Sequence, residues 1–202
     1  MKHKTWILGI NMGHLIVFCD ACILYPAPIR DLLMVCALND LVQLKWSDRV
    51  LNEWIDNLIK NRPDLSRERL EKTKNDMNKA LLDCVVEDYE PLEKKLVLPD
   101  ENDRHVLAAA IASKSKLILT ANLKDFPKDY LSTFNIRACH PDDLFIEIAQ
   151  KNKELFLTTI KECYQKLRKP PQTIEQYIAT LNDKCHLNKT AFFINQNITS
   201  LI

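Results

Sequence analysis

The side chains of this sequence that are best suited to chemistry are four carboxylates, at Asp20, Glu53, Asp103 and Asp125. Asp20 closes the apolar run 15–19, a pattern typical of a buried strand in a parallel sheet. In open α/β sheets, ligands bind in the crevice at the carboxyl ends of the strands. Because a lone Asp at a strand end is most often a turn or helix cap, a chemical role for Asp20 requires that further acids reach the same edge.

Two further acids are predicted to reach the edge at which Asp20 lies. Asp125 comes shortly after the apolar run 117–120, which predicts another buried strand. Asp103 stands near the start of a helix predicted from the small-residue run 106–112. Each acid has an ordinary explanation by itself, since acids at helix N-termini interact favourably with the helix dipole. In a parallel sheet, however, topology alone brings the three carboxylates to one edge.

The fourth acid, Glu53, is predicted to lie on a helix over 47–60, for which Ser47 is a suitable N-cap. A single helical Glu is usually a solvated carboxylate. Several carboxylates in one crevice, however, repel one another and raise one another's pKa unless a cation joins them. Oxygen ligands suit Mg²⁺ or Mn²⁺, which activate water and stabilise the oxygens of an in-line phosphoryl displacement. Together the acids favour metal-dependent hydrolysis of phosphodiester bonds.

The elements that must position these acids alternate between strands and helices. The predicted strands cover residues 15–19, 42–46, 84–88, 117–120 and 134–138. The predicted helices cover residues 29–38, 47–60, 64–82, 106–112 and 141–150. Such alternation predicts an α/β fold with a central parallel sheet and helices on both faces.

After Gln150 the chain changes character. Amphipathic helices are predicted over 154–167 and 173–181, with a Pro-containing break between them. We therefore predict three parts, namely an N-terminal segment over 1–14, an α/β domain over 15–150 and an all-helical C-terminal extension over 151–202.

Charge is divided unevenly between the extension and the rest of the chain. Residues 151–202 hold 8 Lys and Arg against 4 Asp and Glu, a net charge of +4, whereas residues 1–150 hold 20 against 23, a net charge of −3. A net charge of +4 over a tail is weak evidence for binding of nucleic acid.

Composition excludes several classes of protein. Only 2 of the 202 residues are Gly, and both precede residue 14, so phosphate-cradling loops and dinucleotide fingerprints are excluded. Most of the 7 Cys lie in apolar runs, which fits a reducing compartment. We give no redox or metal role to the Cys19–Cys22 pair, because its first thiol ends a buried strand. No signal peptide or membrane-spanning run is predicted, and we expect a cytoplasmic protein.

Four segments resemble the motifs of the PIN-domain ribonucleases, in particular the VapC-like toxins of bacterial type II toxin–antitoxin systems. These segments are FCDACILYPAPIRDLL, VLNEW, DENDRHVLAAA and TANLKDFP, and the resemblance covers roughly residues 15–148. The tail segment LRKPPQTIEQYIATL is similar to a C-terminal helical extension that some members carry. The resemblance implies a PIN-like three-layer α/β/α fold and an endoribonuclease that uses Mg²⁺ or Mn²⁺. It also implies RNA as the substrate and a cognate antitoxin as a protein partner. A homodimer is possible, and no association with a membrane is expected.

By position, the resemblance makes Asp20 the first metal ligand and catalytic acid, Glu53 the helical acid and Asp103 the third acid. The fourth position is ambiguous in this sequence. Some members place an Asp two residues after the strand-end Thr, where this chain has Asn122, and others place an acid just before the Phe, where it has Asp125. We choose Asp125 as the fourth ligand. Asp100 and Glu101 stay open as local substitutes for Asp103.

Four other residues are candidates for support or substrate binding. Thr120 and Asn122 could position water or phosphate, and Arg30 and Arg104 could hold phosphates on either side of the scissile bond, because guanidinium groups match phosphate geometry. For Arg30, simple solvation of its helix is an equally good explanation. No His has the placement of an obvious general base.

Three other functions are alternatives to a PIN-domain ribonuclease. A haloacid-dehalogenase-like phosphatase requires a second Asp where this chain has Cys22, and we set it aside. A degenerate PIN module would bind RNA or a protein without cleavage, but retention of Asp20, Glu53 and Asp103 argues against it. A flap-type DNA nuclease usually needs helical clamps and more basic surface than this chain offers.

Overall fold

The computed structural model describes residues 15–167 and 171–201. The predicted N-terminal segment 1–14 therefore lies outside the described residues. None of the helices in the described part of the chain is long and apolar enough to cross a membrane.

A four-stranded parallel sheet lies at the centre of the fold, in the strand order β2-β1-β3-β4. The strands are β1 Ile16–Cys19, β2 Gln43–Lys45, β3 Leu117–Leu119 and β4 Arg137–Cys139. Val17 on β1 lies opposite Leu44 on one side and Leu117 on the other, and all three side chains are buried. Because every strand runs in the same direction, the residues that follow the four strands meet at one edge.

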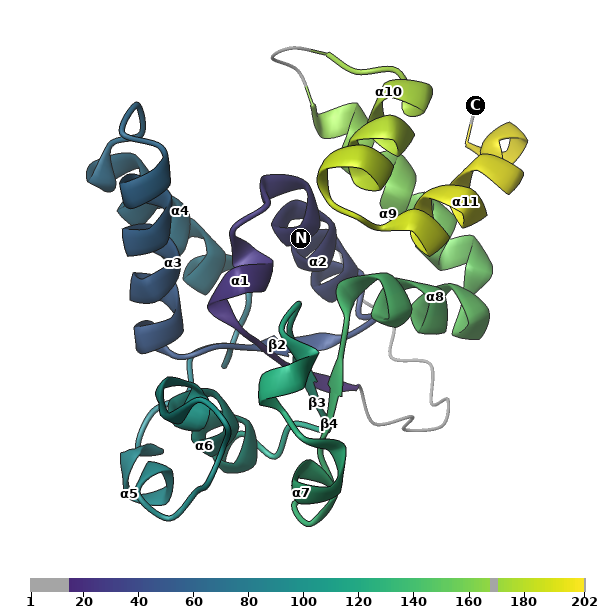
Figure 1. Ribbon diagram of the computed structural model, residues 1–202. Coiled ribbons are helices and arrows are strands. Elements are labelled where there is room, and N and C mark those ends of the chain that lie inside the picture. The colour runs from purple at the N-terminus through teal and green to yellow at the C-terminus, as the bar shows by residue number, and fades with distance from the viewer. Residues whose placement is uncertain (1–14, 168–170, 202) are drawn as a thin grey trace, which may run out of the picture.

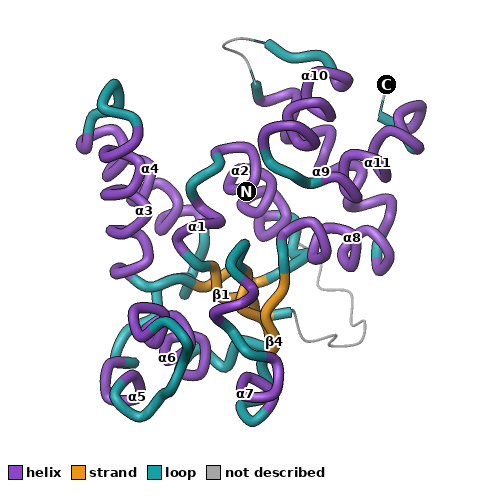
Figure 2. Tube along the Cα trace, in the orientation of Figure 1, coloured by secondary structure: helices purple, strands orange, loops and turns teal. Residues whose placement is uncertain are grey.

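Helices cover both faces of this sheet (Figures 1 and 2). Helix α6 (Arg104–Ala112) packs against β1 and β3, and helix α2 (Ala27–Leu38) lies on the opposite side beside β2. The buried run Ala108–Ala109–Ala110 of α6 carries only methyl side chains, so this helix can approach the sheet closely. The predicted three-layer α/β/α fold with a parallel sheet is confirmed.

Helices α3 (Asp48–Asn61) and α4 (Arg67–Ala80) run in opposite directions and lie beside the sheet, on the left of Figure 1. Ser47 caps α3 as predicted, since its side chain accepts a hydrogen bond from the backbone N–H of Val50 at 3.3 Å. The cap fixes the start of α3 and with it the place of Glu53 two turns later. Helix α1 (Ala21–Leu24) and short helices α5 (Glu90–Glu93) and α7 (Lys128–Ser132) complete this part of the fold.

The prediction of a full strand over 84–88 is wrong. In the described chain this segment forms only one isolated parallel bridge, between Val85 and Trp46 beyond the end of β2. The acidic residues Glu87 and Asp88 follow at once, and Asp88 adopts a positive φ of 57° that ends the extended conformation. The last strand is also displaced from its predicted range, because a turn at Asn135 (φ 56°) delays it to Arg137.

The described residues of the extension form helices joined by short loops. Helix α8 (Pro141–Lys151) leads into α9 (Lys153–Lys166), and the chain ends with α10 (Ile174–Ala179), a π-helical turn η3 (Thr180–Lys184), α11 (Asn188–Gln196) and a 3₁₀ turn η4 (Ile198–Ser200). Thr173 caps α10 in a complete capping box with Gln176. The predicted division at residue 150 falls just before the end of α8, and the division into parts stays a prediction.

The extension shares one hydrophobic core with the sheet domain. Helix α9 packs on α2, and α11 packs on α8. The fully buried ring of Phe156 on α9 lies between Phe145 on α8 and Phe193 on α11, with ring centroids 6.2 and 6.0 Å away. These contacts show that the amphipathic faces predicted for the extension are covered by the rest of the chain.

Candidate active site

Asp20 lies at the carboxyl end of β1 and is 9% exposed. It occupies the N-cap position of α1, yet its side chain makes no capping hydrogen bond. Its Oδ2 atom instead accepts hydrogen bonds from Thr120 Oγ1 at 2.8 Å and Cys22 Sγ at 3.0 Å. The carboxylate is therefore held across the sheet edge, between the ends of β1 and β3, and the explanation of Asp20 as a simple helix cap does not apply.

Asp103 lies at the N-cap position of α6 and, like Asp20, makes no side-chain capping hydrogen bond. Its carboxylate is half-buried. Burial, together with the negative charges of Asp20, Asp100 and Asp125, raises its pKa to about 6, against an opposing effect of His105. Of the predicted acids, Asp20 and Asp125 therefore lie close enough to Asp103 for their charges to act on it, whereas Glu53 is not among these charges.

Asp125 ends the short 3₁₀ turn η2 (Leu123–Asp125) after β3. Its Oδ2 atom accepts a hydrogen bond from the Nδ2 group of Asn122. The two candidates for the fourth position are therefore bonded to each other, with the amide donating and the acid accepting. The acid supplies the negative charge felt by Asp103, which supports the choice of Asp125 over Asn122.

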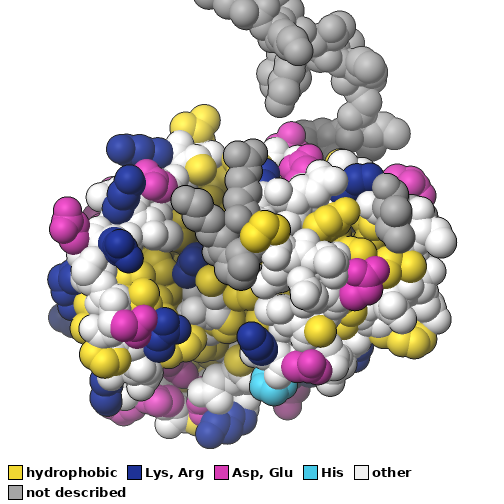
Figure 3. Space-filling model, turned by 90° about the horizontal axis from the view of Figure 1, so that it is seen from above, with side chains coloured by type: hydrophobic (Ala, Val, Ile, Leu, Met, Phe, Trp, Pro, Cys, Tyr) yellow, Lys and Arg dark blue, Asp and Glu magenta, His cyan; other side chains and the backbone are white. Residues whose placement is uncertain are grey.

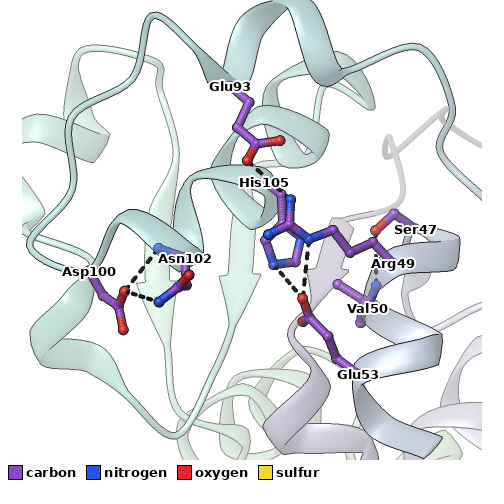
Figure 4. Close-up of polar contacts among 8 residues, drawn as sticks. All are labelled: Ser47, Arg49, Val50, Glu53, Glu93, Asp100, Asn102 and His105. Atoms are coloured by element: carbon purple, nitrogen blue, oxygen red, sulfur yellow. Dashed lines mark hydrogen bonds and ion pairs between the residues drawn. The ribbon is translucent and has the colours of Figure 1, made fainter. Parts of the chain in front are cut away.

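Glu53 is engaged differently from the other acids (Figure 4). Its Oε1 atom is 3.2 Å from Arg49 Nε on the same helix and 3.2 Å from Nε2 of His105 on α6. Burial by itself would raise the pKa of Glu53, but the hydrogen bonds and charges of His105 and Arg49 outweigh it, so the pKa lies below its usual value. The Arg49 side chain also reaches Glu93 on α5, at 3.1 Å.

The His105 imidazole is 1% exposed, so its bond to Glu53 ties α3 to the first turn of α6 inside the protein. His105 follows Asp103 by two residues, and the bond thereby fixes the helix that carries Asp103. Its second nitrogen, Nδ1, is buried without a hydrogen-bond partner among the described residues.

The donor set fits a hard divalent cation, because it consists of carboxylate oxygens whose mutual repulsion a cation would relieve. The pKa of Asp103 is raised by burial first and then by repulsion from Asp20, Asp100 and Asp125. The acids do not close into a finished coordination cage, since no group of three or more His, Cys, Asp or Glu side chains in the described ranges is tight enough to hold a metal ion by itself. An open arrangement of this kind suits Mg²⁺, which keeps several of its waters.

Comparison with known proteins decides the family. Residues 17–124, more than half of the chain, match the family described as "PIN domain". The chain belongs to the PIN-domain family. The resemblance found in the sequence motifs is thus confirmed, and the matched range contains Asp20, Glu53 and Asp103 but ends one residue before Asp125.

One similar protein is named "Putative ribonuclease VapC50", from Mycobacterium tuberculosis (strain ATCC 25618 / H37Rv). It is 35% identical to this chain over 82 residues, which are 41% of this chain and 48% of that protein. The aligned part thus spans about half the length of this relative. No solved structure matches the chain.

The structure separates the two arginines predicted to bind phosphate. The side chain of Arg30 is 14% exposed and lies over the ring of Trp54, 5.1 Å from its centroid. Its guanidinium group also donates to the carbonyl of Leu24 at 3.2 Å and lies 3.6 Å from Asp31. Arg30 therefore joins α2 to α1 and α3 of the PIN domain, a role that neither interpretation of the sequence contained.

Arg104 keeps a position suited to substrate. It pairs with Glu101 at 2.6 Å, and its buried Nε has no hydrogen-bond partner in the described chain. Arg104 lines a cleft of about 390 Å³ next to Asp103, together with Arg49 and Lys94. This cleft also contains three acids, Glu90, Glu93 and Glu101, which balance its three basic residues. A larger cleft of about 690 Å³ is lined by one basic residue, Arg49, and by six acids, namely Asp48, Glu53, Asp56, Glu87, Asp88 and Glu90. The smaller cleft is thus the better place for a nucleic-acid backbone.

Sequence reasoning missed two contributors to the site of the PIN domain. Cys22 received no role in the site from the sequence, although a side chain two residues after an Asp is well placed to bond to it. Arg49 was not singled out, although its spacing of four residues from Glu53 on one helix predicts an ion pair. The contact between His105 and Glu53 joins residues 52 positions apart and has no local signal in the sequence.

Proposed function

We propose that this PIN-domain protein is a metal-dependent endoribonuclease and the toxin of a toxin–antitoxin pair. The observation that carries the proposal is the gathering of Asp20, Asp103 and Asp125 at one sheet edge, where burial and the charges of the neighbouring acids raise the pKa of Asp103 to about 6. Carboxylates that repel one another destabilise the fold. A bound cation would relieve that repulsion and bind a phosphate substrate, which explains why the acids lie together. The name of the relative from Mycobacterium tuberculosis supports the ribonuclease assignment, and the resemblance of the sequence motifs to VapC-like toxins supports the toxin assignment.

In this proposal Asp20, Asp103 and Asp125 hold Mg²⁺ or Mn²⁺, and Glu53 contributes through its Oε2 atom. When bound, the cation supplies charge stabilisation and an activated water for cleavage of a phosphodiester bond. The chain's own residues orient the site: Thr120 and Cys22 hold Asp20, while His105 and Arg49 hold Glu53. Arg104 and Lys94 neutralise substrate phosphates beside the acids.

A cleavage assay with the full chain tests the chemistry. Single-stranded RNA and a flap DNA of matched length are incubated separately with Mn²⁺, and again with excess EDTA. We expect internal cleavage of RNA with Mn²⁺ only. Cleavage of the flap DNA alone would support a DNA nuclease, and RNA binding without cleavage would support the degenerate PIN module.

The proposal includes a cytoplasmic location and a protein antitoxin as partner. Expression in a bacterium tests the assignment as a toxin. The intact chain should arrest growth, and Asp103→Asn produced at the same level should not. Equal arrest by both proteins would show that toxicity does not depend on the acids.

A further inference from the structure

One oxygen atom of Asp20 is bonded twice, and both donors belong to the site. Thr120 Oγ1 donates to Oδ2 at 2.8 Å, and Cys22 Sγ donates to the same atom at 3.0 Å. Among the hydrogen bonds of residues 15–167 and 171–201, none is made by Oδ1. The two oxygens of this carboxylate are therefore not equivalent.

The two donors are themselves fixed by the turn that follows β3. The backbone N–H of Asn122 donates to Thr120 Oγ1 at 3.0 Å, and the backbone N–H of Ala121 donates to Cys22 Sγ at 3.3 Å. Each donor thus accepts one bond from the turn and gives one bond to Asp20. Because backbone N–H groups cannot reorient without unfolding the turn, this arrangement holds the donors and the carboxylate in one orientation.

The alternative explanation is that Cys22 only packs locally at the start of α1. That explanation does not fit its position, since Cys22 is the one exposed thiol among the free cysteines of the described residues and lies at the site rather than in the core. It does not form a disulfide with Cys19, which is free and buried at the end of β1. Its polar contacts with Asp20, Thr120 and Ala121 link the ends of the neighbouring strands β1 and β3.

We propose that Cys22 is a positioning residue, which acts with Thr120 to hold Oδ2 of Asp20 so that Oδ1 alone binds the cation. The inference rests on the proposed function. One-oxygen ligation suits a small cation with octahedral geometry, such as Mg²⁺ or Mn²⁺, better than Ca²⁺, which often takes both oxygens of a carboxylate. Groups that orient a ligand in this way commonly govern metal affinity.

The test measures Mn²⁺ binding by calorimetry without RNA, for the full-length wild type and three variants. Cys22→Ala removes the donor, Cys22→Ser keeps a donor of similar size, and Cys185→Ala is the matched control in the extension. Loss of an orienting group lowers metal affinity about 10- to 100-fold. The affinity of Cys22→Ala for Mn²⁺ should therefore be lower than that of wild type by about this factor, while the affinities of Cys22→Ser and the control stay close to wild type. Thermal unfolding of the metal-free proteins checks that all four are folded.

The outcomes separate the two proposals. If the wild type binds Mn²⁺ and Cys22→Ala binds it equally well, the positioning role is wrong and the proposed function stands. If Cys22→Ser loses affinity as fully as Cys22→Ala, sulfur itself is required and the donor role is overturned. If the wild type does not bind Mn²⁺, the proposed function fails, and the positioning role fails with it.

Discussion

At the scale of single residues, the acids of the sheet edge oppose stability and serve the proposed cation. Asp103 shows this most clearly, because burial and three neighbouring carboxylates raise its pKa from 3.8 to about 6. A raised pKa means that the folded protein holds this proton more tightly than the unfolded chain. In the metal-free protein, Asp103 therefore reduces stability progressively as the pH rises from about 4 to above 6.

The first prediction concerns Asp103→Asn, which removes the repelled charge. Above pH 7 the metal-free variant should be more stable than wild type by about 1 kcal/mol, after allowance for solvent screening of a half-exposed group. The difference should disappear near pH 4, where the wild-type carboxyl is protonated in both states. Urea unfolding at both pH values, in EDTA, measures it.

Added Mn²⁺ should reverse the order of stability. At a concentration 100 times its Kd, a cation that binds only the folded state stabilises it by about 2.7 kcal/mol. Wild type should gain this increment and Asp103→Asn should gain less. A variant that is less stable than wild type in EDTA at pH 8 would contradict the electrostatic account of this residue.

The second prediction concerns Arg104, whose guanidinium group lines the cleft beside Asp103. Arg104→Gln should weaken RNA binding about equally for all sequences and reduce the slope of log K against log salt by roughly one phosphate contact. Filter binding in EDTA, over a range of salt concentrations, provides the readout without cleavage. Arg62→Gln is the matched control, since Arg62 pairs with Asp64 at the turn between α3 and α4; an equal effect of the two changes would remove Arg104 from the RNA surface.

At the scale of secondary-structure elements, the helices of the extension are joined to the PIN domain by buried polar contacts as well as apolar ones. Asp142 on α8 is 6% exposed and accepts backbone hydrogen bonds from Lys189 at 2.9 Å and Thr190 at 2.8 Å, and one from Thr190 Oγ1 at 2.7 Å. Because the N-cap residue of α11, Leu187, has no capping side-chain bond, Asp142 supplies the cap from another helix.

The third prediction is that Asp142→Ala destabilises the protein by about 2–3 kcal/mol, because it leaves the first N–H groups of α11 buried and unpaired. Asp143→Ala is the control, since Asp143 makes only an exposed ion pair with Lys189 and should cost less than about 1 kcal/mol. Denaturant unfolding of both variants gives the comparison. Similar losses for the two would show that the cap contributes little.

The sequence predicted those elements that carry a strong local pattern. The apolar runs before Asp20 and at 117–120 became central strands, and Ser47 and Thr173 capped the predicted helices. The segment 84–88 begins with a strand-like apolar run, but Glu87 and Asp88 follow at once, the positive φ of Asp88 ends the extended conformation, and only one bridge forms. A local apolar run predicts extended backbone but does not specify how many positions of it pair with a neighbour.

The candidate site was predictable to the same extent. Parallel topology predicts that Asp20 and Asp125, which follow β1 and β3, lie at one edge, and after burial the charges of both contribute to the raised pKa of Asp103. The engagement of Glu53 with His105 and the packing of Arg30 on Trp54 depend on how separate helices meet, and periodicity carries no information about such contacts.

At the scale of the whole molecule, the extension completes the core of the protein. Its buried apolar residues belong to the same cluster as those of the sheet domain. A polar contact adds to this link, since Nδ2 of Asn39, the C-cap residue of α2, donates to Thr159 Oγ1 on α9 at 2.9 Å. On the face shown in Figure 3, basic and acidic side chains are interspersed, which does not favour a continuous track for RNA.

The fourth prediction is that a chain truncated before Asn152 unfolds or aggregates, because α2 and α8 lose the helices that cover them and Phe145 loses its stacked partner Phe156. Circular dichroism and size-exclusion chromatography of the truncated chain provide the measurement. A folded, monomeric product that cleaves a short oligonucleotide normally but binds long RNA weakly would instead indicate an extension that guides RNA.

The most direct test of the central claim is the initial rate of RNA cleavage by Asp20→Asn at saturating Mn²⁺. Asp129→Asn, at an exposed position on α7, is the matched control. We predict that Asp20→Asn loses cleavage while its metal-free form stays at least as stable as wild type, and that Asp129→Asn cleaves normally. Undiminished cleavage by a folded Asp20→Asn protein would contradict the assignment of the sheet edge as the catalytic centre.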